Sequence, residues 1–254
     1  MAAFQDPDGA AAVREAAAGH GAAAAPGGLA QLLVSLQLSD SAFPTGYYTL
    51  SHGLEGYAQA RALDAERLPL LLEDQLLHGV GPSDATALAH AHRAAAAGDW
   101  ARVAAVDTRL DAAKLSREIR VAATRTGRQL LSLADEVFTL PGTAAYRQIV
   151  QDGGAPGSQA VVAGVVYAGT RVPVAQAVAS DLFAFCASFA GAALRLRLAD
   201  HRQAQVLLRR AAPVIEEATR EALGRDLADL GATVFAVDVM SARHERAEAR
   251  LFAS

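Results

Sequence analysis

Apolar residues recur at spacings of three and four over most of the chain from Leu29 onward, the pattern of amphipathic α-helices. Gly, Pro, Ser and Asp interrupt this pattern and mark the expected helix ends. The Val-rich stretch 158–168 is assigned to a buried helix, because no partner strand of comparable strength exists elsewhere. Helices are expected over 29–39, from Tyr48, over 63–78 and 82–97, from Trp100, over 107–133, around Tyr146, over 158–168, from Pro173, and over 181–198 and 202–223. The pattern predicts an all-α, single-domain bundle of roughly ten helices.

The same pattern divides the chain into three segments. Residues 1–28 are rich in Ala and Gly and lack apolar periodicity, so we expect a disordered N-terminal tail. Residues 29–239 form the helical domain. Residues 240–254 are strongly charged, yet they finish with the apolar pair Leu251 and Phe252 behind Arg250. This last segment is either a frayed end or a segment that orders on a partner, and the second interpretation explains the apolar pair better.

Composition narrows the classes of function. Hydrophobic residues make up 52% of the chain and aromatic residues only 6%, which favours close helix packing over a β-sandwich. The net charge is -4, and the basic residues are 22 Arg and the single Lys114. Since there is no excess of positive charge, nucleic acid is not expected as a partner.

Cysteine content and apolar run lengths indicate the compartment. Cys186 is the single cysteine, so neither an intramolecular disulfide framework nor a cysteine-rich zinc site is expected. The N-terminal residues lack the basic region and apolar run of an export signal. The longest charge-free apolar segment, 182–194, is 13 residues long, shorter than the roughly 20 residues that span a bilayer. We therefore expect a cytoplasmic protein that does not enter a membrane.

The sequence lacks the usual catalytic and metal-binding signatures. Asp74 with His78, and His244 with Glu248, have the spacing that places two ligands on one helix face, but each pair is only half of a site. Neither a G-x-x-x-x-G-K-[ST] phosphate loop nor a G-x-S-x-G elbow occurs. We expect no catalytic residues, no metal site and no cofactor held by this chain.

The stretch FPTGYYTLSHGLE, residues 43–55, is the chemically richest part of the chain. Pro44 fixes one φ angle and Gly46 permits a tight turn, so the tyrosines should leave this turn at the start of a helix. Helical spacing then places four side chains on one stripe: Tyr48, Ser51, His52 and Glu55.

Two interpretations of this stripe stay open. It is either a capped helix, with Tyr48 half-buried and Glu55 bonded internally, or an aromatic and polar contact surface for another protein. Tyrosine suits the second role because it offers a large contact area with little entropy loss. A small-ligand-binding or regulatory domain, with residues 43–57 as a pocket wall, is the alternative function. Because no nucleophile or second carboxylate lies nearby in the sequence, recognition is favoured over catalysis.

Three sequence blocks resemble the family of the urease accessory protein UreF. They are the L-Q-L-x-D-S-A-F-P-x-G-x-Y-x-x-S-x-G-L-E block at 36–55, the R-E-x-R that precedes Gly127, and the ending M-x-x-R-H-E with R-L-F-x-S. The resemblance implies an all-α, non-enzymatic scaffold that forms a homodimer. It also implies binding to UreD (also called UreH) and recruitment of the GTPase UreG, so that nickel reaches apo-urease. In this picture nickel is handled by the complex.

The resemblance also implies roles for individual residues. Tyr48 and Arg250 would contribute to recruitment of the GTPase, and His244 and Glu245 would lie in the segment that orders when the UreD-type partner docks. Members of the family often carry Ser/Thr-Asn and D-G-Q where this chain has 187–189 and 201–203. The predicted partner-binding set is Phe43, Pro44, Gly46, Tyr48, Ser51, Glu55, His244, Glu245, Arg250, Leu251 and Phe252.

Overall fold

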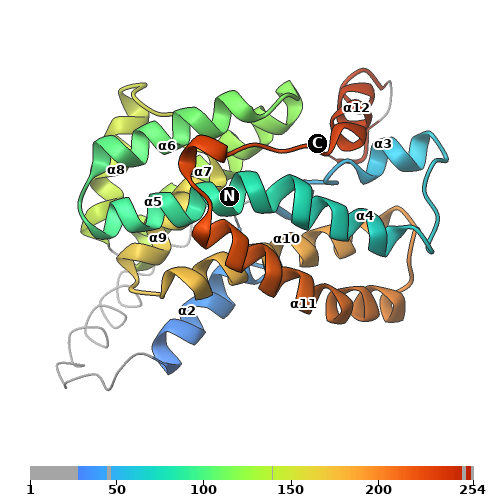
Figure 1. Ribbon diagram of the computed structural model, residues 1–254, viewed down its shortest axis with the longest axis horizontal. Helices are drawn as coiled ribbons and strands as arrows, with labels where there is room; N and C mark the ends of the chain where they lie inside the picture. The colour runs from blue at the N-terminus through green and yellow to red at the C-terminus, as the bar shows by residue number, and fades with distance from the viewer. Residues whose placement is uncertain (1–27, 45–46, 139, 248–249, 253–254) are drawn as a thin grey trace, which may run out of the picture.

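The computed structural model describes residues 28–44, 47–138, 140–247 and 250–252. Within these ranges the chain forms helices and no strands, which confirms the all-α prediction (Figure 1). The predicted N-terminal tail lies, apart from Gly28, outside the described residues. The elements are α2 (Leu29–Ser39), η1 (Tyr47–Thr49), α3 (Leu54–Gln59), α4 (Leu68–Asp74), η2 (Gln75–Ala85), α5 (Thr86–Ala96), α6 (Trp100–Ala113), α7 (Arg117–Phe138), α8 (Pro141–Gln151), α9 (Gln159–Gly169), α10 (Val174–Arg195), α11 (His201–Gly224), η3 (Leu227–Asp229) and α12 (Phe235–His244).

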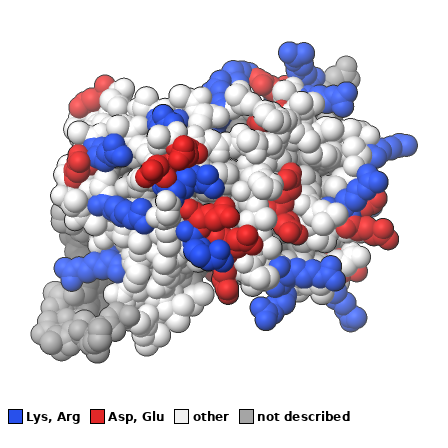
Figure 2. All heavy atoms as spheres, in the orientation of Figure 1, with Lys and Arg blue, Asp and Glu red and all other residues white. Residues whose placement is uncertain are grey.

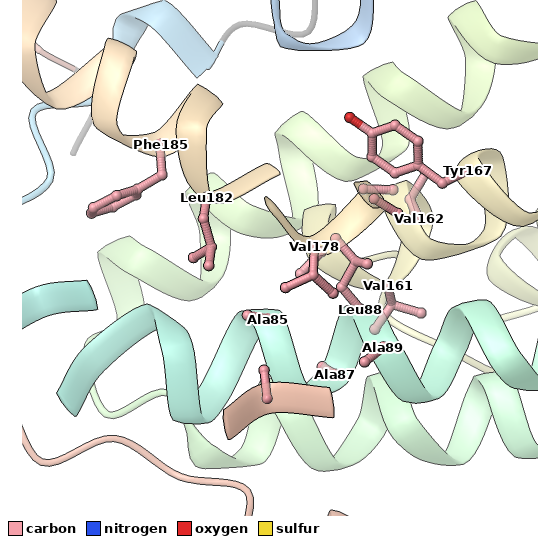
Figure 3. Close-up of a cluster of buried hydrophobic side chains, with 14 of the residues drawn as sticks. Ala85, Ala87, Leu88, Ala89, Val161, Val162, Tyr167, Val178, Leu182 and Phe185 are labelled. Carbon is pink, nitrogen blue, oxygen red and sulfur yellow. The ribbon is translucent and has the colours of Figure 1, made fainter. Parts of the chain in front are cut away.

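The core is built around α5 and α9, which pack closely against each other. Both helices bury small and β-branched side chains, and α10 adds Val178, Leu182 and Phe185 to the same cluster (Figure 3). At Gly164 of α9 a Cβ atom would lie 2.7 Å from the Leu88 carbonyl oxygen of α5. The alanine-rich composition therefore allows these two helix backbones to approach closely, and the prediction of a buried helix over 158–168 is confirmed.

The helices α4, η2 and α5 run on without a break, which corrects one prediction. The sequence pattern predicts that the proline at position 82 opens a new helix, but this proline lies inside η2, a π-helical stretch. A proline inside an α-helix loses one backbone hydrogen bond and clashes with the preceding turn. The wider π turn accommodates the ring, and such stretches usually occur where a helix is locally distorted.

The amphipathic run predicted over 107–133 is divided into two helices. The end of α6 is Ala113 and the start of α7 is Arg117, with three residues between them. The Lys114 ammonium in this break donates to both carboxylate oxygens of Asp84 on η2, at 2.7 and 2.8 Å. The apolar periodicity of the sequence continues across residues 114–116, so this periodicity did not indicate that one helix ends there and another begins.

Helix α10 is the only described helix that is long and apolar enough to cross a membrane, judged by length and composition. In this structure 56% of its most apolar window is buried inside the protein. It contacts α11, α9, α5 and α2. A buried core helix passes the same test of length and composition, and the packing of α10 is of that kind.

A loop between α8 and α9 packs tightly against α7 at Gly127. The buried Asp107 carboxylate of α6 accepts the Tyr146 hydroxyl at 2.5 Å and the backbone N–H groups of Gly157 and Ser158 at 2.6 and 3.1 Å. These bonds hold the loop so close to α7 that a Cβ atom at Gly127 would overlap the Gly157 carbonyl oxygen. Only glycine fits at this position of the R-E-x-R…G block.

We expect Gly127→Ala to lower the free energy of unfolding by about 1–3 kcal/mol, the usual range for overpacking. The substitution forces the loop or α7 to move, and the Asp107 bonds hold the loop in place. Gly224→Ala is the matched control, because a Cβ atom there would meet no atom within 4 Å. Urea denaturation of the three proteins measures the difference. Equal destabilisation by the two substitutions would contradict the close contact at Gly127.

Candidate docking site at the C-terminal segment

The backbone between η1 and α3 does not continue as one helix. His52 has a φ angle of 53° and Gly53 one of 84°, so two successive residues adopt the left-handed conformation. The helix predicted from Tyr48 is therefore wrong in its first part, because α3 begins only at Leu54. Ser51, His52 and Glu55 consequently do not share a helical stripe.

His52 is turned into the core toward α10. Its Nε2 atom lies 2.8 Å from the Ser188 hydroxyl, which itself donates to the Tyr47 carbonyl oxygen at 3.0 Å. Since the hydroxyl proton is used there, the imidazole Nε2–H is the donor to Ser188. Burial, and secondarily the positive charge of Arg195, lowers the pKa of His52 to about 3. His52 is thus a neutral structural residue, and Ser188, at one of the departures from the family pattern, anchors it.

Glu55 faces the opposite way, toward the end of the chain. Its side chain is buried, with the residue only 4% exposed, in the first turn of α3. Oε1 accepts the backbone N–H of Leu251 at 2.7 Å, and Oε2 accepts that of Phe252 at 2.9 Å. Oε2 also lies 2.7 Å from Nε2 of His244. The carboxylate therefore grips two successive peptide groups of the C-terminal segment.

His244 joins this carboxylate to a second one. The residue ends α12 and is 1% exposed. Its Nδ1 atom lies 3.0 Å from Oε2 of Glu118, which belongs to the first turn of α7. The Arg250 guanidinium donates to Oε1 of Glu118 at 3.3 Å. Glu55, Glu118, His244 and Arg250, with the two backbone N–H groups, form what we term the C-terminal latch.

Two further contacts hold the same region. Glu245 forms an ion pair with Arg117, accepting from its Nε atom at 2.7 Å, and so ties α12 to the start of α7. The Phe252 ring is buried against the core cluster, with the Arg195 guanidinium 4.2 Å from the ring centroid. Leu251 points outward and is 67% exposed. The terminal apolar pair is therefore split between the core and the surface.

The residues of the first sequence block, 36–55, are only partly described, and they lie in different surroundings. Phe43 is half-buried against the core and Pro44 is exposed, whereas Gly46 lies outside the described residues. Tyr48 lies in η1, and its side chain is among those not described. The neighbouring Thr49 accepts a hydrogen bond from Arg125 of α7 at 3.2 Å. Helix α7 therefore touches both the first block, through η1, and the last block, through Glu118.

Glu118 is the residue that reasoning from the sequence missed. It is absent from the predicted partner-binding set. Its position in the R-E-x-R block was the available signal, because that block was singled out together with the R-H-E ending. Within the described residues, no cluster of three or more His, Cys, Asp or Glu side chains is arranged to hold a metal ion.

A mainly apolar cavity of about 260 Å³ lies behind the first block, between α2, α9, α10 and α11. Phe43 and Tyr47 line it, as the alternative of a pocket wall requires. Its buried acid is Asp181, whose Oδ1 accepts from the Gln159 amide at 2.8 Å. Burial raises the pKa of Asp181 to about 7, and the negative charge of Asp84 acts in the same direction while the Gln159 bond opposes it.

The fold and the site together describe an all-helical protein whose buried polar cluster holds its own terminal segment. The family model UreF matches residues 62–212. The urease accessory protein UreF of Kocuria rhizophila is 34% identical over 238 residues, covering 89% of this chain and 98% of that protein. The UreF protein of Xanthobacter autotrophicus is 35% identical over 244 residues, covering 93% and 98%. The chain belongs to the UreF family of urease accessory proteins.

The free energy of unfolding of the parent chain should fall as pH rises, because Asp181 is buried. We expect Asp181→Asn to abolish this pH dependence. The folded protein holds the Asp181 proton up to about pH 7, whereas the unfolded chain releases it near pH 4. Between these values the folded state binds more protons, so raising the pH destabilises it, by at most about 1.4 kcal/mol per pH unit.

Urea denaturation of parent and variant at pH 5 and pH 7.5 measures this effect. The variant should gain stability relative to the parent between the two values. Asp226→Asn is the control, since Asp226 is exposed and makes no side-chain cap of η3. A parent–variant difference that is the same at both pH values would contradict the assignment.

Proposed function

We propose that this chain is a non-enzymatic scaffold for urease maturation. In this proposal it acts in the cytoplasm, binds UreD (UreH), recruits the GTPase UreG, and so supports nickel insertion into apo-urease. Membership of the UreF family supports a role in urease maturation. The observation that carries the docking role is the C-terminal latch, which presents Arg250 and the exposed Leu251 next to α3 and α7.

The charge on the surface agrees with recognition of proteins. Basic and acidic side chains are interspersed on the face shown in Figure 2, and neither sign covers it. Such a mixture offers ion pairs to a protein partner, but it lacks the continuous positive field that a nucleic-acid backbone requires.

The proposal includes a homodimer, and the exposed leucines of α2 support it. Leu29, Leu32, Leu33 and Leu36 are between 46% and 70% exposed among the described residues. Helix α10 packs beside α2 and adds the exposed Phe183. Monomers rarely expose an apolar area of this kind, and a twofold dimer buries it against its own copy.

We expect light scattering to give about twice the chain mass of 26.3 kDa, and Phe183→Arg to shift the protein toward the monomer. Burying an unpaired guanidinium at a dimer contact is costly, which is the reason for the shift. Phe235→Arg is the matched control, since Phe235 is an exposed aromatic residue on α12, away from α2 and α10. A monomeric parent chain would contradict the homodimer.

We expect Tyr48→Ala and Arg250→Ala each to weaken recruitment of the UreG-type GTPase at least about tenfold, as loss of an interface anchor does. Helicity should change little, because residue 48 lies in the three-residue η1 and residue 250 lies beyond the end of α12. Co-purification with UreD- and UreG-type partners, followed by titration of the GTPase, is the measurement. Arg246→Ala is the control, an exposed arginine of the same segment.

Two outcomes separate the parts of the proposal. A parent chain that binds neither partner would overturn the scaffold role itself. A complex that is unchanged in both variants would remove only the assignments of Tyr48 and Arg250.

A further inference from the structure

The C-terminal latch places one imidazole between two buried carboxylates. Nε2 of His244 faces Glu55 at 2.7 Å and Nδ1 faces Glu118 at 3.0 Å. A neutral imidazole carries a single N–H and so can donate to one of them only. The other nitrogen would then present a lone pair to a carboxylate oxygen, which is repulsive in a buried site.

The remaining partners of the two carboxylates show where the additional proton must lie. Both oxygens of Glu55 already accept backbone N–H groups, from Leu251 and Phe252. A proton on Glu55 would therefore face another hydrogen-bond donor, which is unfavourable. The additional proton therefore lies between Nδ1 of His244 and the Glu118 carboxylate. The contact is satisfied whether the nitrogen or the carboxyl oxygen carries the proton.

The charges around this contact balance only when that proton is present. Glu55 from α3 and Glu118 from α7 supply two negative charges, and Arg250 supplies one positive charge. Glu245 of the segment is neutralised separately by Arg117. Arg195 of α10 lies over the Phe252 ring. With one proton shared by His244 and Glu118 the buried group is neutral, and without it the group carries a net negative charge.

We propose that the C-terminal segment docks onto α3 and α7 only by taking up one proton at the His244–Glu118 contact, so that its docking weakens as pH rises. When the segment is released its imidazole is solvated, and a solvated imidazole is mostly neutral above about pH 6.5. Above that pH the docked form holds one proton more than the released form. By linkage, docking then weakens about tenfold per pH unit. The inference concerns this chain alone and does not depend on its partners.

The backbone amides of Leu251 and Phe252 report docking directly, because both donate to Glu55. Their hydrogen exchange is followed by NMR in the full chain between pH 6.5 and 9, and each rate is divided by that of an unstructured peptide of the same sequence. We expect the protection factor of both amides to fall about tenfold per pH unit over part of this range. A protection factor that is constant over the range would overturn the proposal, whether or not any variant folds.

The variant Glu118→Gln tests whether docking requires the proton at the His244–Glu118 contact. The side-chain amide that this substitution introduces donates an N–H to the bare Nδ1 atom, so a neutral imidazole satisfies both contacts and no proton is needed. Protection of Leu251 and Phe252 in this variant should persist at pH 9 without the slope. His201→Gln, at the exposed first residue of α11, is the control and should keep the slope of the parent. The same slope in the Glu118 variant would overturn the role of the His244–Glu118 contact.

Discussion

A carboxylate removed from water must find donors for both of its oxygens, and this constraint decides how the chain ends. Glu55 on α3 and Glu118 on α7 are both buried, and among the described residues the one donor shown from their own helices is the Gln59 amide, 3.5 Å from Oε1 of Glu55. The closer donors come from α12 and the last residues: the His244 ring, the Arg250 guanidinium and two backbone N–H groups. The C-terminal segment thus completes the polar interior of the bundle. Accordingly, α12 itself crosses the boundary expected between residues 239 and 240.

The helices that the sequence pattern predicts well are those whose ends carry their own chemical signal. Asp99 caps α6 through its side chain, and Asp200 forms a capping box at the start of α11, so both starts could be read locally. The break at 50–53 has only an ambiguous signal in Gly53, because an isolated glycine is also tolerated inside a helix. The π-helical turn around position 82 is held by tertiary packing, and packing overrides the usual meaning of proline.

The site was predictable as a list of residues but not as an arrangement. Glu55, His244 and Arg250 each belong to blocks that the sequence marks as unusual, and reasoning from the sequence found all three. Their contacts join positions nearly two hundred residues apart in the case of His244 and Glu55, and no helical periodicity carries that information. Glu118 was missed for the same reason: a charged residue on an amphipathic helix looks solvent-facing until its partner is known.

Ionic contacts give this docked segment something that apolar contacts would not. Replacing a buried ion cluster by well-packed apolar residues often leaves stability unchanged or raises it, so strength alone does not account for the cluster. Because Glu55 accepts two successive N–H groups, it fixes the register of the segment to a single residue. That register sends Phe252 into the core and Leu251 outward; a shift by one residue would bury a different side chain. The strength of the ionic contacts in the C-terminal latch also depends on competing charges and on protonation, whereas the strength of apolar contacts does not.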